Sequence, residues 1–315
     1  MHLYYRLLVV GVSIGCCCLY SCSSKNVNVE LKSFSLQVLE ADVFVPSRSR
    51  LETREAFITN MQAKIEASES LFVRVFVPLC DNVHQGILPV PKAIGNGQDP
   101  KSNLYWGARY GVRSVFSNAQ GWGTEQMPFS DSDSVILDRV VFRKKLPSGS
   151  DLIVLAEAYD GRQMQSCLDD FFDAARGNGA AIKNFDLSGC DLANPNLVVF
   201  NGHNGIIKAD VMPNQLSADR PRDVAAIACL TDESFTVQLE QMNAYPALMT
   251  LSLMAPEGYV LKALIEEWAS LGTGEEIHSA VATAYNTYQK CGIRGARGVF
   301  STGWELDDGR DYFWW

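Results

Sequence analysis

The sequence has no long basic segment. Its net charge is −9, and no cluster of lysines and arginines stands out beyond the short run Arg143-Lys144-Lys145. Binding of a nucleic-acid backbone needs cationic side chains concentrated on one face of a protein. The charge pattern therefore argues against nucleic acid as a partner.

The sequence also lacks an internal repeat, a low-complexity tract and, at its N-terminus, an apolar run long enough to span a bilayer comfortably. Residues 7–19 are apolar, follow Arg6, and lead into Leu19-Tyr20-Ser21-Cys22 and two serines. A positive residue, a short apolar region and a small residue before the cleavage point are typical of a signal peptide. We expect residues 1–22 to be a targeting segment.

The end of this segment resembles the lipobox of bacterial lipoproteins, in which the cysteine is acylated and becomes the mature N-terminus. The resemblance implies lipidation of Cys22 and attachment to a membrane through buried acyl chains. Ser23 is not the aspartate associated with inner-membrane retention, which favours the outer membrane, on its periplasmic face or at the cell surface. A plain secretory signal with a spare cysteine and a short membrane anchor are the alternatives.

Few residues suggest a metal site or a cofactor. The mature chain keeps Cys80, Cys167, Cys190, Cys229 and Cys291, and these form no CxxC pair. Cys80, Asp81 and His84 are close in sequence, but no second ligand pair accompanies them, so we expect neither metal nor cofactor. Outside the cytoplasm thiols tend to pair, and because five is odd, at least one cysteine should stay free or pair between molecules.

Apolar patterning predicts alternating strands and helices. Strands are expected over residues 71–80, 135–146, 152–158, 197–200, 224–228 and 247–254, with a short strand as an option at 43–45. Helices are expected over residues 51–68, 165–176, 256–271 and 275–289, and another after Ser102. The last of the four ranges has Ile277, Val281, Ala284 and Tyr288 on its expected core stripe. We divide the mature chain into an N-terminal spacer and helix, residues 23–70, and one α/β domain, residues 71–315.

This alternation predicts a three-layer α/β/α sandwich with a mostly parallel central sheet. In such folds the chemistry gathers just beyond the carboxyl ends of the strands. His203 lies three residues past Phe200, and Cys229 directly follows Ala228, so both residues fall at predicted strand ends. If the two strands are parallel neighbours, the imidazole and the thiol emerge at one edge of the sheet, about 5 Å apart in strand spacing.

A histidine beside a cysteine can take the thiol proton, and the thiolate then attacks a carbonyl carbon. The residues around His203 fit this chemistry, because glycines allow close approach of a substrate and leave amides available for an oxyanion. The expected cleft residues are Gly202, Asn204 and Gly205. Asp81 and His84 follow another predicted strand and are expected to border the same cleft.

The stretches "LVVFNGHNG" and "VAAIACLTDESF" resemble the cysteine peptidases of the caspase, legumain and gingipain clan. That clan has an apolar strand followed by His-Gly and a second apolar strand followed by Ala-Cys. The resemblance implies a caspase-like sandwich, a Cys–His dyad with Cys229 as nucleophile and His203 as general base and acid, and peptides or proteins as substrates. Asn204 stands where the clan has glycine.

The sequence indicates the substrate side-chain preference less clearly than it indicates the candidate catalytic residues. Ile227, two residues before Cys229, brings no charge to the position that is polar in caspases and legumains. Asp232, Glu233 and Glu257 are the acidic residues that can attract a basic side chain. Each also has a simpler explanation, as an exposed acidic turn or as a carboxylate at a helix N-terminus.

Two other interpretations remain open. The domain can be a catalytically inactive caspase-like lipoprotein that binds a ligand or acts as a scaffold, and Asn204 favours this alternative. It can also be a structural protein in which a disulfide occupies Cys229.

Overall fold

The computed structural model describes residues 48–127, 135–177, 190–191, 193–206, 222–242 and 244–303, with side chains from Glu55 onward. The predicted signal peptide, Cys22 and the optional strand at 43–45 lie outside the described residues. So does most of the connection between His203 and Cys229. No helix in the described ranges combines the length and the apolar composition needed to cross a membrane.

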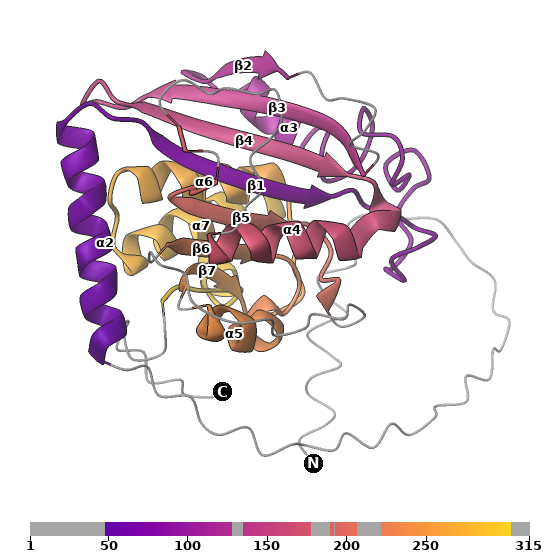
Figure 1. The fold of residues 1–315 in the computed structure, drawn as a ribbon. Coiled ribbons are helices and arrows are strands. Elements are labelled where there is room, and N and C mark those ends of the chain that lie inside the picture. Colours follow the sequence, from indigo (N-terminus) through magenta and orange to yellow (C-terminus); the bar gives the residue numbers. More distant parts are fainter. Residues whose placement is uncertain are drawn as a thin grey trace, which may run out of the picture. The chain divides into compact units, whose positions relative to one another are not determined.

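A mixed, mostly parallel sheet forms the centre of the described chain (Figure 1). Its eight strands have the order β2-β3-β4-β1-β5-β6-β7-β8. The strands are β1 (Leu71–Pro78), β2 (Gly123–Gln126), β3 (Ile136–Lys145), β4 (Asp151–Tyr159), β5 (Leu197–Asn201), β6 (Asp223–Ile227), β7 (Tyr245–Thr250) and β8 (Phe300–Ser301). The strands from β4 to β7 in this order run parallel, whereas β2, β3 and β8 run antiparallel to their neighbours.

Helices cover both faces of the sheet, so the expected α/β sandwich is confirmed at this level. The helices are α2 (Arg48–Glu66), α3 (Val112–Ser117), α4 (Met164–Arg176), α5 (Thr231–Gln241), α6 (Gly258–Ala269), α7 (Gly274–Gln289) and α8 (Ile293–Arg297), with a 3-10 turn η1 (Gly161–Gln163) before α4. In Figure 1, α4 lies in front of the sheet and α6 and α7 lie behind it.

The alternation of side chains along β1 explains the two layers. Val73, Val75 and Val77 join one core cluster with side chains of α2, α3, α6 and α7. Phe76 points to the other face, where its ring meets Phe171 of α4 at 6.1 Å between centroids. All residues of β1, β5 and β6 are buried, as expected for strands covered on both faces.

The helix expected after Ser102 is mostly absent, because α3 begins only at Val112. Before it, the chain folds back through tight turns: a Cβ on Gly107 would lie 2.1 Å from the Lys101 carbonyl oxygen, and a Cβ on Gly111 would lie 2.3 Å from the Trp106 carbonyl oxygen. Trp106 is fully buried without helical geometry. Its apolar character therefore marks the core and not a helix.

Three further differences concern the second half of the chain. Helix α5 was not expected, since only Phe235 and Leu239 supply large apolar side chains to the core. Strand β7 ends at Thr250, so residues 251–257 form a loop instead of the end of a strand. In α7 the buried stripe is Ile277, Val281 and Tyr285, whereas Tyr288, which was expected in the core, is 46% exposed.

Candidate functional site

Strands β5 and β6 are parallel neighbours, which is the condition that a His203–Cys229 dyad requires. Phe200 pairs with Ala226 and Asn201 with Ile227. Each strand is followed within two residues by one member of the expected dyad, His203 after β5 and Cys229 after β6. Both residues therefore leave the sheet at the same carboxyl edge.

Asn204 connects the loops that follow these two strands. Its side chain is nearly fully buried, and Nδ2 donates to the Cys229 carbonyl oxygen at 2.6 Å and to Ser234 Oγ at 2.7 Å. Oδ1 accepts from the Ile206 amide at 3.3 Å. Glycine has no side chain that can make these bonds. The residue that departs from the clan pattern is thus a structural brace between the His203 and Cys229 loops.

The glycines beside His203 are required by close packing. A Cβ on Gly202 would lie 2.9 Å from Pro78 Cγ, and a Cβ on Gly205 would lie 2.3 Å from Met164 Cγ. The Gly202 amide donates to the Ile227 carbonyl oxygen at 3.1 Å, so it already has an acceptor. The remaining candidate donors to an oxyanion are therefore the backbone amides of Asn204 and Gly205.

Cys229 is a partly buried free thiol. Its Sγ donates to the Met254 carbonyl oxygen at 3.5 Å and accepts from the Met254 amide at 3.4 Å. In the described chain the His203 ring is not a hydrogen-bond partner of this sulfur. Burial raises the pKa of Cys229, and the bond from the Met254 amide only partly opposes this effect. The thiol is therefore neutral at neutral pH in this structure.

This environment predicts the pH dependence of thiol alkylation. Because the pKa of Cys229 is raised, thiolate forms only at a pH above the ordinary value of about 8.5. The midpoint of Cys229 alkylation by iodoacetamide, followed by mass spectrometry of the Cys229 peptide, should lie at higher pH than the midpoint for glutathione measured alongside. A midpoint at or below that of glutathione contradicts the environment described for the sulfur.

All five cysteines in the described ranges are free thiols. The alternative of a disulfide at Cys229 is therefore not supported. Cys80 and Cys167 are fully buried, while Cys291 is exposed. Burial raises the pKa of Cys80 to about 11, which makes it a poor nucleophile. Cys229 is the partly accessible thiol at the carboxyl edge of the sheet.

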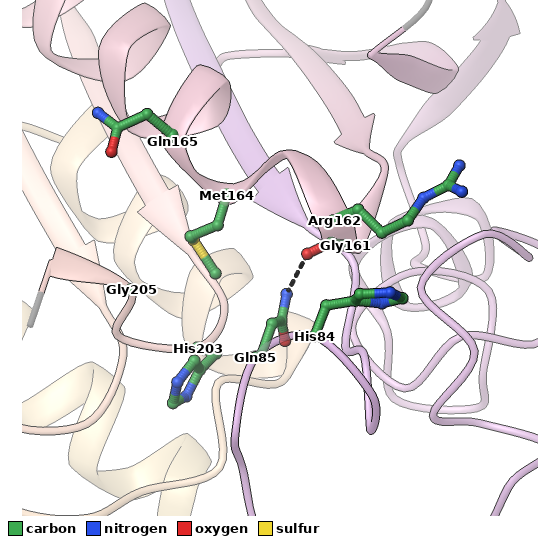
Figure 2. Close-up of a pocket in the computed structure, with 8 residues that line it drawn as sticks. All are labelled: His84, Gln85, Gly161, Arg162, Met164, Gln165, His203 and Gly205. Carbon is green, nitrogen blue, oxygen red and sulfur yellow. Dashed lines mark hydrogen bonds between the residues drawn. The ribbon is translucent and has the colours of Figure 1, made fainter. Parts of the chain in front are cut away.

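His203 lines a pocket of about 110 Å³ at this edge. Figure 2 shows its ring and that of His84 on the two sides of Gln85, below the start of α4. The lining residues are His84, Gln85, Gly161, Arg162, Met164, Gln165, His203 and Gly205. His84 thus borders the same pocket as His203, as expected, whereas Asp81, which was expected there too, is not among the lining residues. Cys229 is not among the lining residues.

Asp81 orients His84. The Nδ1 atom of His84 lies 2.9 Å from Asp81 Oδ2, and this carboxylate also accepts from the Val83 amide and from Gln98 Nε2, both at 2.8 Å. Burial alone would raise the pKa of Asp81, but the hydrogen bonds from Gln98, His84 and Val83 outweigh it and lower the pKa. A carboxylate that stays ionised thus holds an imidazole at the mouth of the pocket.

No group of three or more metal-ligating side chains occurs in the described ranges.

The three acidic specificity candidates are placed differently. Asp232 accepts from Ser301 Oγ at 2.6 Å, and Glu233 is exposed in the first turn of α5. Glu257 is the N-cap residue of α6, in the loop after β7, and is half-buried. Burial raises its pKa, opposed by hydrogen bonds from Tyr259 and Gln289. Glu257 follows β7 at the same carboxyl edge of the sheet at which Asp232 and Glu233 begin α5 after Cys229.

Two tyrosines lie within electrostatic range of both Glu257 and Cys229. Burial raises the pKa of Tyr105, and its electrostatic interactions with Cys80, Cys229 and Glu257 act in the same direction. Burial raises the pKa of Tyr285, which also lies within electrostatic range of Glu257 and Cys229. Neither tyrosine is marked by the sequence motifs, because each is separated from them by a long stretch of chain.

Asn201 is a further residue that the motifs do not reveal. It is fully buried at the end of β5, and its Nδ2 donates to the Pro256 carbonyl oxygen at 2.9 Å. This bond fixes the loop that carries Glu257 against the strand that leads to His203. Its Oδ1 is buried without a hydrogen-bond partner in the described chain. A polar residue ending the otherwise apolar "LVVFN" is the sequence signal that marks it.

The chain has no recognised relatives in three comparisons. No protein-family model, no curated protein and no solved structure matches it.

Proposed function

We propose that the α/β domain is a cysteine peptidase-like hydrolase of the bacterial cell envelope, with Cys229 as nucleophile and His203 as general base and acid. The observation that carries the proposal is the parallel pairing of β5 with β6, which brings the ends of both motif strands to one edge of the sheet. The N-terminal segment that ends at Cys22 supports anchoring at the outer membrane by acyl chains instead of by a spanning helix.

The reaction begins with transfer of the Cys229 proton to the His203 imidazole. The Cys229 sulfur then attacks the carbonyl carbon of the scissile peptide bond, and the oxyanion is stabilised by backbone amides of the His203 loop. His203 returns the proton to the leaving amine, which leaves a thioester on Cys229. Water, activated by His203, hydrolyses the thioester and restores the thiol.

The Cys229 thiol is not yet oriented for proton transfer to His203. Its hydrogen bonds to the Met254 backbone hold it away from a base, so a side-chain rotation of Cys229 must precede proton transfer. Catalytic hydrogen bonds are often made only in the substrate complex. Because the Met254 loop also carries Glu257, the proposal assigns the trigger of this rotation to binding of a substrate against the loop.

A thiol-directed peptide probe tests the proposal. Full-length protein in detergent is treated with peptidyl acyloxymethyl ketones, and labelling is compared in the wild type and in Cys229→Ala, His203→Ala and Cys291→Ala. We expect labelling of the wild type and of Cys291→Ala, none of Cys229→Ala, and a decrease of roughly 10²-fold or more in rate for His203→Ala. Labelling that persists in Cys229→Ala removes Cys229 as nucleophile.

Glu257 is proposed to select a basic substrate side chain. Probes with arginine or lysine before the reactive group should label faster than neutral probes, and Glu257→Gln should reduce this preference about 10-fold or more, since a charge-assisted hydrogen bond contributes about 1.5 to 3 kcal/mol. The preference should grow with pH as Glu257, whose pKa is raised, becomes ionised. Glu233→Gln, an exposed carboxylate, is the matched control. An equal effect of both substitutions rejects the assignment.

A binding function without turnover is the second candidate. It is favoured by the neutral thiol bonded to Met254 and by the Asn204 brace, which fixes the two loops. In that case peptides bind the edge of the sheet but remain uncleaved, and the probes do not label Cys229.

A further inference from the structure

A second cavity lies in the helical layer, between the segment before α3 and helices α6 and α7. Its volume is about 620 Å³, within the range of small-molecule sites. We call it the tyrosine groove, and define it by Arg109, Tyr110, Tyr259, Lys262, Glu266 and Tyr288. None of these residues takes part in the Cys229 chemistry; Tyr259 alone contacts the proposed hydrolase site, through its hydrogen bond to Glu257.

The tyrosine groove contains a fixed aromatic surface. The Tyr259 and Tyr288 rings stack at 4.1 Å with an interplanar angle of 8°, and the Tyr110 ring meets Tyr288 edge-on at 5.2 Å. Tyr259 is buried, and its hydroxyl accepts from Gln289 Nε2 at 2.8 Å. The ring contacts hold Tyr288 in place. Because the residue is 46% exposed, its ring also remains accessible. Such a surface suits a planar ring.

The charged side chains of the tyrosine groove are predominantly cationic. The Arg109 guanidinium lies 5.2 Å from the centroid of the Tyr110 ring. Glu266 accepts from Lys262 and from Lys144, each at 2.5 Å, so two ammonium groups share one carboxylate. The groove therefore has an excess of positive charge on a chain whose net charge is −9. An anion is favoured there and a cation is not.

We propose that the tyrosine groove binds an anionic ligand with a planar ring, the ring stacking on Tyr288 and the acidic group lying near Arg109 and Lys262. This site is independent of the Cys229 chemistry. Small-molecule sites commonly combine an aromatic lining with a few charged groups that fix orientation. The ligand class is an aromatic acid, either free or as an aromatic residue next to a carboxylate in a peptide.

Three probes with the same indole ring and different charge test the class. Saturation-transfer NMR with the full-length protein compares N-acetyl-tryptophan, which is anionic, N-acetyl-tryptophanamide, which is neutral, and tryptamine, which is cationic. Two partly exposed cations predict that the acid binds about three- to tenfold more tightly than the amide, with tryptamine weakest. The peptide N-acetyl-Asp-Trp-amide shows by its affinity relative to the acid whether a peptide or a free acid is preferred.

Variants locate the binding. Tyr288→Ala, and Tyr288→Leu in case the smaller residue disturbs α7, should weaken all probes. Arg109→Gln with Lys262→Gln should bring the acid to the affinity of the amide and leave the amide unchanged. Ile293→Ala and Lys145→Gln, which replace exposed residues outside the groove, are matched controls and should have no effect. Equal affinity of acid and amide, unchanged binding in both Tyr288 variants, or no saturation by the acid overturns the proposal.

Discussion

Replacing Glu157 with glutamine is expected to lower the free energy of unfolding by about 3 to 5 kcal/mol. Glu157 of β4 is fully buried, and its two carboxylate oxygens serve two arginines. Oε2 accepts from Arg74 Nε at 3.1 Å and Nη2 at 2.9 Å, and Oε1 accepts from Arg139 Nε at 2.8 Å. Removing the negative charge leaves two buried guanidinium groups without the carboxylate that they share.

The pKa of Arg74 is raised, the direction expected for a guanidinium beside the Glu157 carboxylate. Burial by itself would lower the pKa, but the charge of Glu157, with smaller effects of neighbouring groups, raises it instead. The loss expected for Glu157→Gln is a large part of the free energy of unfolding of a domain, which is commonly about 5 to 15 kcal/mol. Urea unfolding followed by circular dichroism measures it.

Two variants serve as references for this measurement. Glu275→Gln removes an exposed carboxylate paired with Arg297 and should cost less than about 1 kcal/mol. The triple variant Arg74→Met, Arg139→Leu and Glu157→Leu replaces the buried ions with apolar groups and should recover much of the stability lost in Glu157→Gln. A Glu157→Gln protein as stable as Glu275→Gln shows that the buried network does not contribute as described.

Replacing His203 with alanine is expected to lower kcat/KM for peptide hydrolysis by roughly 10² to 10⁴, with little change in KM. The physical reason is the raised pKa of Cys229, which keeps the thiol neutral unless a base removes its proton. The defect should shrink as the pH rises, because Cys229 then ionises without help. A peptide identified by the labelling probes, made fluorogenic, provides the assay.

His84→Ala is the informative comparison in this assay. His84 borders the same pocket as His203 and is oriented by Asp81, so it is the other imidazole able to act as a base. If the larger loss and its recovery at high pH belong to His84→Ala, the assignment of the base to His203 is wrong. If neither variant changes the rate, and Cys229→Ala is equally active, the hydrolase proposal fails.

The sequence predicted the sheet better than it predicted its surroundings. Strands β1, β5 and β6 are short apolar runs because both of their faces are buried, and that pattern is visible without coordinates. The mostly parallel direction of the strands followed from the alternation with helices, whereas the adjacency of β5 and β6 was a supposition. The exposed strand β2 and helix α5 have weak apolar patterns, so their positions depend on tertiary contacts that no local pattern encodes.

The candidate site shows the same division. The positions of His203 and Cys229 at strand ends were readable from the sequence, since each follows an apolar run. The bonds of the Cys229 sulfur to Met254 were not, because they depend on the loop after β7, which was expected to be strand. The brace formed by Asn204 was also hidden, since the resemblance pointed to a missing glycine instead of to an amide with three hydrogen-bond partners.

The position of β1 in the sheet affects the order of assembly during synthesis. It is the first strand in the described part of the chain, yet its partners on either side are β4 and β5, which are made much later. Its apolar residues therefore have no partner until the chain reaches Tyr159, and they are paired on both sides only once it reaches Asn201. Pairing between strands that are distant in sequence slows folding and prolongs the exposure of aggregation-prone apolar segments. A newly made chain should consequently depend on a holding chaperone until its central strand is enclosed.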